Sequence, residues 1–151
     1  MKKPLVLGCW LGVAVLAFAG ERVALWPEGK IPDFQPQQIA ATTLEVKAPE
    51  FKAAERAMPY LDWYEAPAEK NGGCMVLISG GGYQSCCDGV WIDRAAKKFA
   101  ELGFICVSLT YRTPRPQALP IYQSAWEDGQ RAVRLVRSEA QKRGFDPEKI
   151  G

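Results

Sequence analysis

The chain has 151 residues, of which 48% are apolar, with 19 lysines and arginines against 17 acidic residues and no histidine. This apolar fraction suits one globular domain with a hydrophobic core and excludes a disordered or fibrous chain. A formal charge of +2 provides no basic surface of the kind that binds nucleic acid or anionic lipid.

Residues 1–19 have the features of a secretory signal peptide. Two lysines precede a long apolar run, and Ala17 and Ala19 form the small-x-small pattern of a cleavage site. We therefore predict cleavage after Ala19, a mature domain of residues 20–151, and export to the periplasm or out of the cell. Cleavage would leave 17 basic side chains against 17 acidic ones and no stable membrane insertion. An uncleaved N-terminal membrane anchor is the alternative, for which the apolar run is marginal in length.

Export would place Cys74, Cys86, Cys87 and Cys106 in an oxidising compartment, where disulfides form. Four cysteines permit three full pairings, and the choice among them stays open. Cys74 and Cys106 lie within apolar runs, which predicts that both pack in the core as small hydrophobic side chains, whereas Cys86 and Cys87 fall in a loop. Because the chain has no histidine and no C-x-x-C spacing, we expect no metal site.

The first predicted elements are strands. Three prolines in residues 25–38 indicate an extended segment that leads into the domain. Candidate strands follow at residues 42–46 and 60–65, the second rich in aromatic side chains. The stretch "CMVLI" at residues 74–78 is apolar throughout, which predicts a strand that is covered on both faces.

A helix and a further strand come next. Apolar side chains recur with the helical period from Ile92 to Leu102, and Gly103 stands where a left-handed cap would end the helix. The stretch "FICVSLTY" at residues 104–111 predicts a second buried strand. A helical crossover of this length implies that residues 74–78 and 104–111 run parallel.

A longer helix is predicted over residues 122–143, with Gly144 as its cap. Its expected inner face consists of small or apolar residues: Ala125, Gly129, Ala132, Val133, Val136 and Ala140. The stretch "FDPEKIG" then predicts a loop and the first residues of another strand. The order of elements predicts an α/β domain with a mostly parallel sheet and flanking helices.

A glycine triplet, Gly80 to Gly82, directly follows the strand at residues 74–78. Ligands of such sheets bind at the carboxyl ends of the strands, and glycine lets backbone N–H groups approach them. Two fixed N–H donors suit a developing negative charge, so the triplet is a candidate oxyanion hole, with an ordinary loop as the alternative. Nucleotide-binding patterns are excluded, because G-x-G-x-x-G would need glycine where the chain has Ser85, and G-K-[ST] is absent.

The sequence around the triplet resembles a known family. The stretch "LISGGGY" resembles the H-G-G-G-[YF] motif of esterases and lipases of the α/β-hydrolase fold, and "LGFICVSLTYR" resembles their next strand. "AWEDGQRAVRLVRSEA" is similar to the following helix, and "GFDPEKIG" to the segment before the nucleophile elbow. "LWPEGKIP" resembles the N-terminal part of secreted carbohydrate esterases of the acetylxylan-esterase-like kind. The resemblance implies that residues 20–151 form the N-terminal part of an α/β-hydrolase domain.

The resemblance also implies the roles of the site residues. Gly81 and Gly82 would donate their backbone N–H groups to the oxyanion, Gly80 would shape the turn, and Tyr83 would line the acyl or sugar pocket. The substrate would be a small-molecule or carbohydrate ester, with neither a metal nor an organic cofactor.

Four other side chains have two interpretations. The resemblance implies that Arg112 and Asp128 form a structural pair, whereas the helix dipole would also favour a solvated Asp128. Trp91 and Trp126 would either stack on sugar rings or pack as buried aromatic side chains, the commoner arrangement.

Two features depart from the family's pattern. Ser79 stands where the family usually has histidine, so a hydroxyl must replace the imidazole. The chain contains no histidine and no G-x-S-x-G, so we expect the Ser-His-Asp triad beyond Gly151 and no activity from these residues alone. The parent protein would be a secreted serine esterase. A non-catalytic, exported glycan- or protein-binding fragment is the main alternative, and a peptidase of the same fold is a weaker one.

Overall fold

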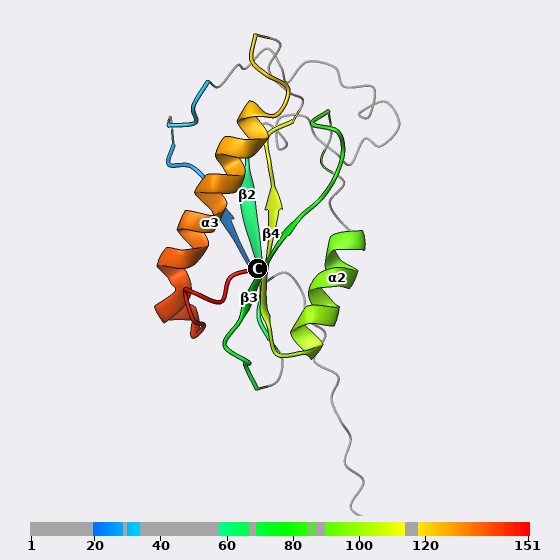
Figure 1. Ribbon diagram of the computed structural model, residues 1–151, viewed down its shortest axis with the longest axis vertical. Coiled ribbons are helices and arrows are strands. Elements are labelled where there is room, and N and C mark those ends of the chain that lie inside the picture. Colours follow the sequence, from blue (N-terminus) through cyan, green and yellow to red (C-terminus); the bar gives the residue numbers. More distant parts are fainter. Residues whose placement is uncertain are drawn as a thin grey trace, which may run out of the picture.

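The structure is a computed structural model that describes residues 20–28, 30–33, 58–66, 69–84, 86, 90–113 and 118–151. Its elements in chain order are β1 (Glu21–Ala24), β2 (Tyr60–Tyr64), β3 (Cys74–Ile78), α2 (Val90–Glu101), β4 (Ile105–Thr110) and α3 (Gln123–Arg143). The strands form one sheet in the order β1-β2-β4-β3, and α2 and α3 cover opposite faces of it (Figure 1). The described residues thus form the α/β arrangement predicted from the sequence.

The sheet contains both parallel and antiparallel pairs. β3 and β4 are parallel, with Cys74 opposite Ile105, as the helical crossover between them requires. β2 pairs antiparallel with both β1 and β4, so this part of the sheet is mixed. Only nine residues, 65–73, link β2 to β3, which is too few for a crossover between parallel strands. β3 therefore runs in the opposite direction to β2, and so does β4, which is parallel to β3.

Residues 149–151 extend the sheet on the outer edge of β3. The Cys74 N–H donates to Lys149 O at 2.9 Å, and the Gly151 N–H donates to Cys74 O at 3.0 Å. A parallel bridge joins Cys74 and Ile150. The prediction that this segment leads into another strand is confirmed.

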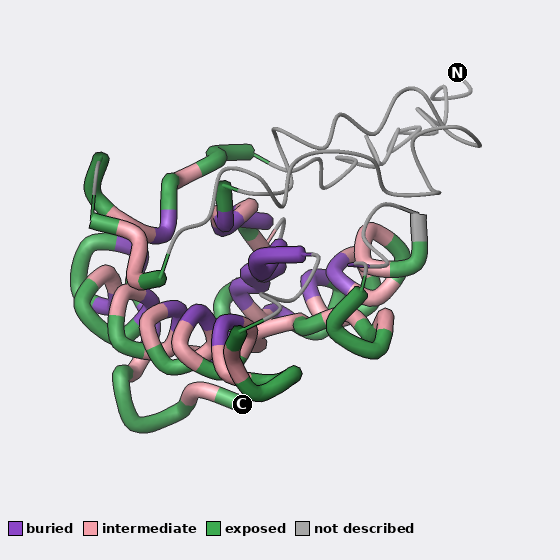
Figure 2. Tube along the Cα trace, turned by 90° about the horizontal axis from the view of Figure 1, so that it is seen from above, coloured by how far each residue is buried: buried purple, intermediate pink, exposed green. Residues whose placement is uncertain are grey.

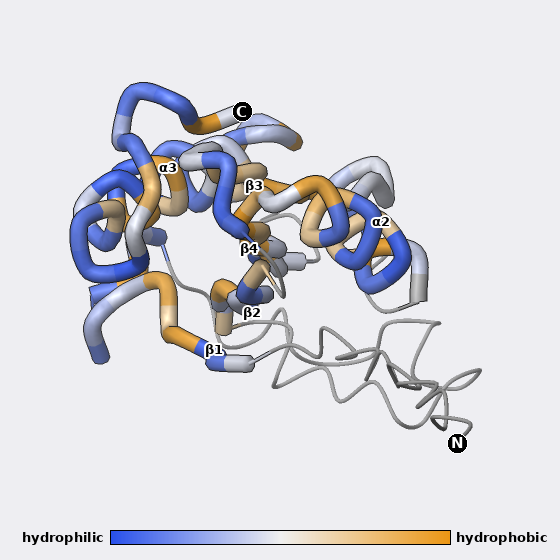
Figure 3. The backbone as a smooth tube through the Cα atoms, turned by 90° about the horizontal axis from the view of Figure 1, so that it is seen from below, coloured by the Kyte–Doolittle hydropathy of each residue, from blue (hydrophilic) through white to orange (hydrophobic). Residues whose placement is uncertain are grey.

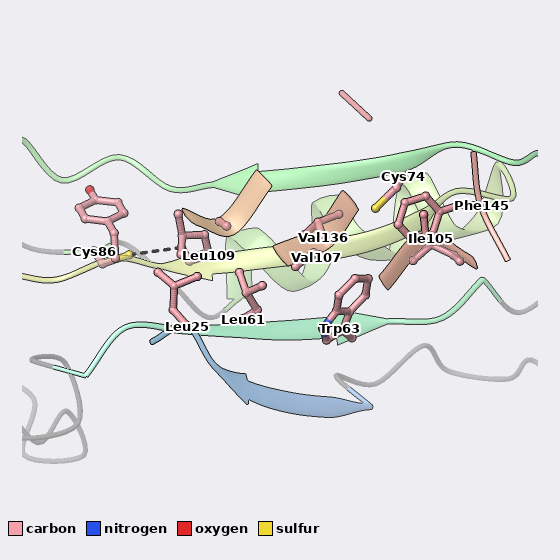
Figure 4. Packing of buried hydrophobic residues seen from close by; sticks show 13 residues of the cluster. Leu25, Leu61, Trp63, Cys74, Cys86, Ile105, Val107, Leu109, Val136 and Phe145 are labelled. Atoms are coloured by element: carbon pink, nitrogen blue, oxygen red, sulfur yellow. Dashed lines mark hydrogen bonds between the residues drawn. The ribbon is translucent and has the colours of Figure 1, made fainter. Parts of the chain in front are cut away.

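The core lies on both faces of β4, whose six residues are all buried. Alternate side chains of a strand point to opposite faces, so Ile105, Val107 and Leu109 pack under α3 while Cys106 packs under α2. Figure 4 shows the cluster under α3, and Figure 2 shows the buried residues concentrated between the two helices. In Figure 3 the outward turns of α3 are hydrophilic, as expected of a helix with one face on the sheet.

Both helices end where the sequence predicts, on Gly103 and Gly144, which have φ angles of 84° and 76°. Of the predicted inner face of α3, Ala132, Val136 and Ala140 are buried and Ala125 packs against the core. Gly129 and Val133 are only partly buried, and the polar residues Ser124 and Asp128 are buried instead. On α2, Leu102 is 66% exposed because the helix ends at Glu101. The inner face of α2 is centred on Ala96, which belongs to the predicted apolar face, and on Ala100, both fully buried, with Phe99 packed in the same cluster.

β1 was not predicted from the sequence, since its four residues are mostly exposed and show no alternation. It is positioned by its register with β2, where Arg22 pairs with Asp62. The signal peptide, the candidate strand at residues 42–46 and Cys87 lie outside the described residues. Among the residues that the structure describes, no helix is long and apolar enough to cross a membrane.

The three described cysteines, Cys74, Cys86 and Cys106, are buried, and no disulfide joins any two of them. Cys74 and Cys106 point to opposite faces of the sheet, as predicted for core residues. Cys86 lies in a loop, as predicted, but it is buried there, and its Sγ lies near Leu109 O, four residues along β4 from Ile105, the partner of Cys74. That distance is about 13 Å along a strand, well beyond the reach of a disulfide. These three cysteines therefore cannot pair with one another in this fold.

We expect Cys74 and Cys106 to resist alkylation in the folded chain. Burial raises the pKa of Cys74 to about 12 and that of Cys106 to about 11, so neither thiolate forms at about pH 8, where a free cysteine does react. Iodoacetamide labelling followed by peptide mass mapping measures this, with the urea-unfolded chain as the control. Labelling of either residue at the same rate in both states would show that the core is not packed in this way.

Candidate functional site

A cavity of about 810 Å³ opens at the carboxyl ends of β3 and β4. Three segments line it: residues 78–83, Tyr111 directly after β4, and the first turns of α3 with Tyr122, Ala125, Trp126 and Gly129. None of these lining side chains is charged. All four predicted site residues, Gly80, Gly81, Gly82 and Tyr83, are thus brought together on one wall.

The glycine loop has a backbone that requires glycine. Gly81 has φ 146°, and Gly82 and Tyr83 have φ 60° and 63°. The Gln84 N–H donates to Gly81 O at 3.1 Å, and this bond with two positive φ angles between its ends is the pattern of a type I′ turn. Only glycine adopts the φ of Gly81 readily, and the turn holds Tyr83 in a conformation that is rare for a bulky residue. Gly80 precedes this turn.

The amide groups of the loop are available to a ligand. Within the described part of the chain, the N–H groups of Gly81 and Gly82 donate to no other residue. A backbone donor without a protein partner is satisfied by water or by a bound acceptor. Two such donors on adjacent residues, in a cavity whose described lining residues are uncharged, can bind an oxygen atom that carries negative charge.

Ser79 and Cys86 close the base of this loop. The Ser79 Oγ lies 3.0 Å from the Cys86 Sγ, and the Cys86 thiol lies 3.9 Å from Leu109 O (Figure 4). The Cys86 thiol has one hydrogen, so when it donates to Leu109 O it can only accept the hydrogen of the Ser79 hydroxyl. The serine that stands in the place of the family's histidine therefore connects the glycine loop to the end of β4.

Two aromatic side chains form the wall of the cavity that α3 contributes. Tyr122 and Trp126 lie one helical turn apart, with ring centroids separated by 6.1 Å and ring planes at 69°. They are 49% and 61% exposed. Trp91 is 72% exposed and does not line the cavity. The interpretation of Trp91 and Trp126 as buried aromatic residues is therefore wrong, and only Trp126 belongs to the site.

A buried ion pair positions α3 against the end of β4. Asp128 has no exposed surface, and its carboxylate accepts bonds from the backbone N–H of Arg112 at 2.8 Å and from Arg112 Nε at 3.0 Å. The Trp26 indole donates to the same carboxylate at 2.8 Å, and Arg112 also donates to Pro32 O. Burial raises the pKa of Asp128, and the Arg112 guanidinium opposes that shift. The solvated Asp128 is thus wrong, and the structural pair is confirmed.

Sequence reasoning missed Tyr111 and Tyr122 as lining residues. Tyr111 had a usable signal, because it follows a buried strand and must therefore lie at the same edge of the sheet as the glycine loop. For Tyr122 the only signal in the sequence was its spacing of four residues from Trp126. This spacing places both residues on one side of a helix but does not show which side faces a cavity.

The solved structures similar to this chain are hydrolases. An acetyl ester-xyloside bifunctional hydrolase from Caldicellulosiruptor lactoaceticus matches with a TM-score of 0.63 and 25% identity, over 91% of this chain and 43% of that one. The esterase Est2 of Thermogutta terrifontis matches with a TM-score of 0.52 and 26% identity, over 62% and 35%. An α/β hydrolase from a deep-sea metagenome library matches with a TM-score of 0.51 and 21% identity, over 61% and 39%.

The sequence comparisons are shorter. A stretch of 77 residues is 36% identical to endo-1,4-beta-xylanase B of Butyrivibrio fibrisolvens and spans 51% of this chain but 12% of the xylanase. No protein-family model matches. The chain spans less than half the length of the solved structures above. Its described residues therefore have the fold of part of an α/β hydrolase, and the neighbours with this fold include ester hydrolases.

We expect Asp128→Asn to lower the free energy of unfolding by about 1.5–3 kcal/mol, because the change removes the charge-assisted hydrogen bonds between Arg112 and Asp128 and leaves Glu127, which is 27% exposed, as the remaining carboxylate on Arg112. Urea unfolding followed by circular dichroism measures the loss.

Asp62→Asn is the matched control. It breaks the Arg22–Asp62 pair, in which the Arg22 side chain is 58% exposed, and should cost less than about 1 kcal/mol. Equal losses in the two variants would contradict the structural role of Asp128.

Proposed function

We propose that this chain supplies the oxyanion-binding part of a secreted serine esterase that deacylates carbohydrate or small acyl esters. The observation that carries the proposal is the cavity at the carboxyl ends of β3 and β4, where Gly81 and Gly82 line the wall with amide groups that no described residue accepts from. The nucleophile, the acid and the base would lie beyond Gly151, because the chain has no histidine and no G-x-S-x-G. These 151 residues alone would be inactive.

The proposed chemistry follows from charge. When a serine oxygen attacks an ester carbonyl, the bond electrons move to the carbonyl oxygen, which becomes negative. The N–H groups of Gly81 and Gly82 would donate to that oxygen. The described residues of the wall carry no charged side chain, and such surroundings make each of these hydrogen bonds stronger than it is in water, because fewer competing dipoles surround it.

The comparisons support an ester substrate with a sugar component. One similar structure is named for its action on acetyl esters and xylosides, and another is an esterase. The protein that shares 36% identity over 77 residues is named as a xylanase. Export would follow from the signal peptide predicted at residues 1–19.

The gene provides the first test of this proposal. We expect the reading frame to continue past codon 151 into a G-x-S-x-G within about ten residues, and later into a histidine. Sequencing downstream of codon 151 settles the point. A stop codon there, or a continuation without the serine motif, would contradict the proposal and favour the non-catalytic binding protein.

In the protein encoded by that reading frame, we expect Gly81→Ala to lower kcat for 4-nitrophenyl acetate by about 10²–10³-fold with little change in KM. Alanine does not adopt a φ of 146°, so the backbone at residue 81 must change its conformation. The N–H groups of residues 81 and 82 then no longer point at the substrate oxygen. Spectrophotometric assay of nitrophenol release measures both constants.

Gly72→Ala is the control for backbone strain. Gly72 has φ 81°, no atom lies within 4 Å of an added Cβ, and the residue does not line the cavity. The variant should lose stability but keep kcat. If Gly72→Ala lowers kcat as much as Gly81→Ala does, the rate loss comes from strain and the oxyanion role is wrong.

A further inference from the structure

The thiol of Cys86 lies directly behind the glycine loop. Its side chain is 2% exposed and belongs to the core cluster under α3, and it does not line the cavity. Ser79, at the start of the loop, does line the cavity, and its Oγ lies 3.0 Å from the Cys86 Sγ. The two ends of the loop that carries Gly81 and Gly82 therefore meet at this contact.

Cys86 joins the loop to β4 through its side chain. In the part of the chain that the structure describes, the loop's own backbone hydrogen bond runs from the Gln84 N–H to Gly81 O and stays within the turn. No backbone hydrogen bond among the described residues joins residues 80–84 to β4. The Cys86 Sγ, in contrast, lies 3.9 Å from Leu109 O on β4 (Figure 4). The described contacts thus fix the loop on the sheet through a sulfur atom.

A thiol suits this position for two reasons. Buried cysteine packs as a small apolar side chain, and its sulfur both donates and accepts a weak hydrogen bond. Cys86 uses both properties, since it packs in the core cluster and contacts Ser79 and Leu109. Alanine at this position would remove the hydrogen bonds and leave a gap behind the loop, into which the loop can move.

The direction of the loop amides depends on how firmly the loop is held. Oxyanion donors act at about 2.7–3.1 Å from the substrate oxygen, and a shift of about 1 Å can cost about 10²-fold in rate. The loop also contains Tyr83 at φ 63°, a conformation that costs free energy in a bulky residue and persists only where the surroundings hold it. A contact that closes the base of the loop therefore bears directly on the aim of its N–H groups.

We propose that Cys86 is a positioning residue of the oxyanion site, whose contacts with Ser79 and β4 hold the loop so that the Gly81 and Gly82 N–H groups point at the substrate oxygen. This inference rests on the proposed esterase function. Cys86 acts through Ser79 and the loop, since it lies outside the cavity lining. Loss of the amide direction lowers kcat and leaves KM unchanged, whereas a merely structural loss lowers the amount of folded protein.

The test measures the hydrolysis of 4-nitrophenyl acetate by the protein that the full reading frame encodes. We expect Cys86→Ala to lower kcat by at least about tenfold, with KM unchanged within about twofold. Cys86→Ser keeps a donor and an acceptor beside Ser79 and should recover most of the lost rate. The double variant Ser79→Ala/Cys86→Ala should be no slower than the slower single variant, because both changes remove the same contact. Ser79→Ala also tests the contact if Cys86→Ala does not fold.

Cys74→Ala is the matched control, because Cys74 is fully buried in the same core cluster but starts β3, at the opposite end of that strand from the glycine loop. It should lower the stability and leave kcat unchanged. A normal kcat in Cys86→Ala, an equal loss of kcat in Cys74→Ala, or additive losses in the double variant would each overturn the proposal.

Hydrogen exchange distinguishes a failure of this inference from a failure of the proposed function. Exchange of the peptide that carries residues 79–84, measured by mass spectrometry, should be faster in Cys86→Ala than in the wild-type protein, while peptides from β4 and α3 stay unchanged. This measurement needs no enzymatic activity. If the wild-type protein hydrolyses no ester, the proposed function fails, and unchanged exchange in the loop would show separately that Cys86 does not hold it. If the wild-type protein is an esterase and Cys86→Ala matches it, the inference alone fails.

Discussion

The buried pair of Arg112 and Asp128 is the interaction on which the site depends. Arg112 follows β4, Asp128 lies on α3, and the backbone and side chain of Arg112 both bind the carboxylate. Trp26, from the segment after β1, donates to the same group. Because a buried charge needs an opposite charge beside it, the pairing of Arg112 with Asp128, and with Glu127 next to it, holds the end of β4 and the start of α3 together. The cavity lies at that junction.

The same pair decides which way α3 faces. With Ser124 and Asp128 turned inward, the small residues Ala125 and Gly129 line the cavity, and Ala125 also packs against the edge of the core. Because these two residues are small, they leave the cavity open between α3 and the glycine loop. The orientation of α3 that buries Ser124 and Asp128 also places Trp126 at the rim of this cavity. A buried polar contact thus produces both the opening of the cavity and the aromatic surface beside it.

The opposite wall is held by different contacts. The turn from Gly81 to Gln84 sets the direction of the loop, and the contacts from Ser79 through Cys86 to Leu109 join the loop to β4. The two walls therefore meet on one central strand, whose residues are all buried. The cavity therefore has an amide-bearing wall on one side of that strand and an aromatic wall on the other.

The sequence by itself determined the elements whose signal is local. The apolar run of β3, the helical period of α3, the caps at Gly103 and Gly144, and the position of the glycine loop after an apolar strand all follow from neighbouring residues. The prediction that β3 is covered on both faces is only partly correct, because Cys74 is buried but the next three residues are half-buried and Ile78 is exposed. Only the tertiary structure decided the rotation of α3, the burial of Cys86, the exposure of Trp126 and the pairing of β1. Each of these depends on a partner far along the chain. Periodicity cannot show that a carboxylate on a helix will be neutralised by an arginine after a distant strand, and that contact turned the helix and opened the site.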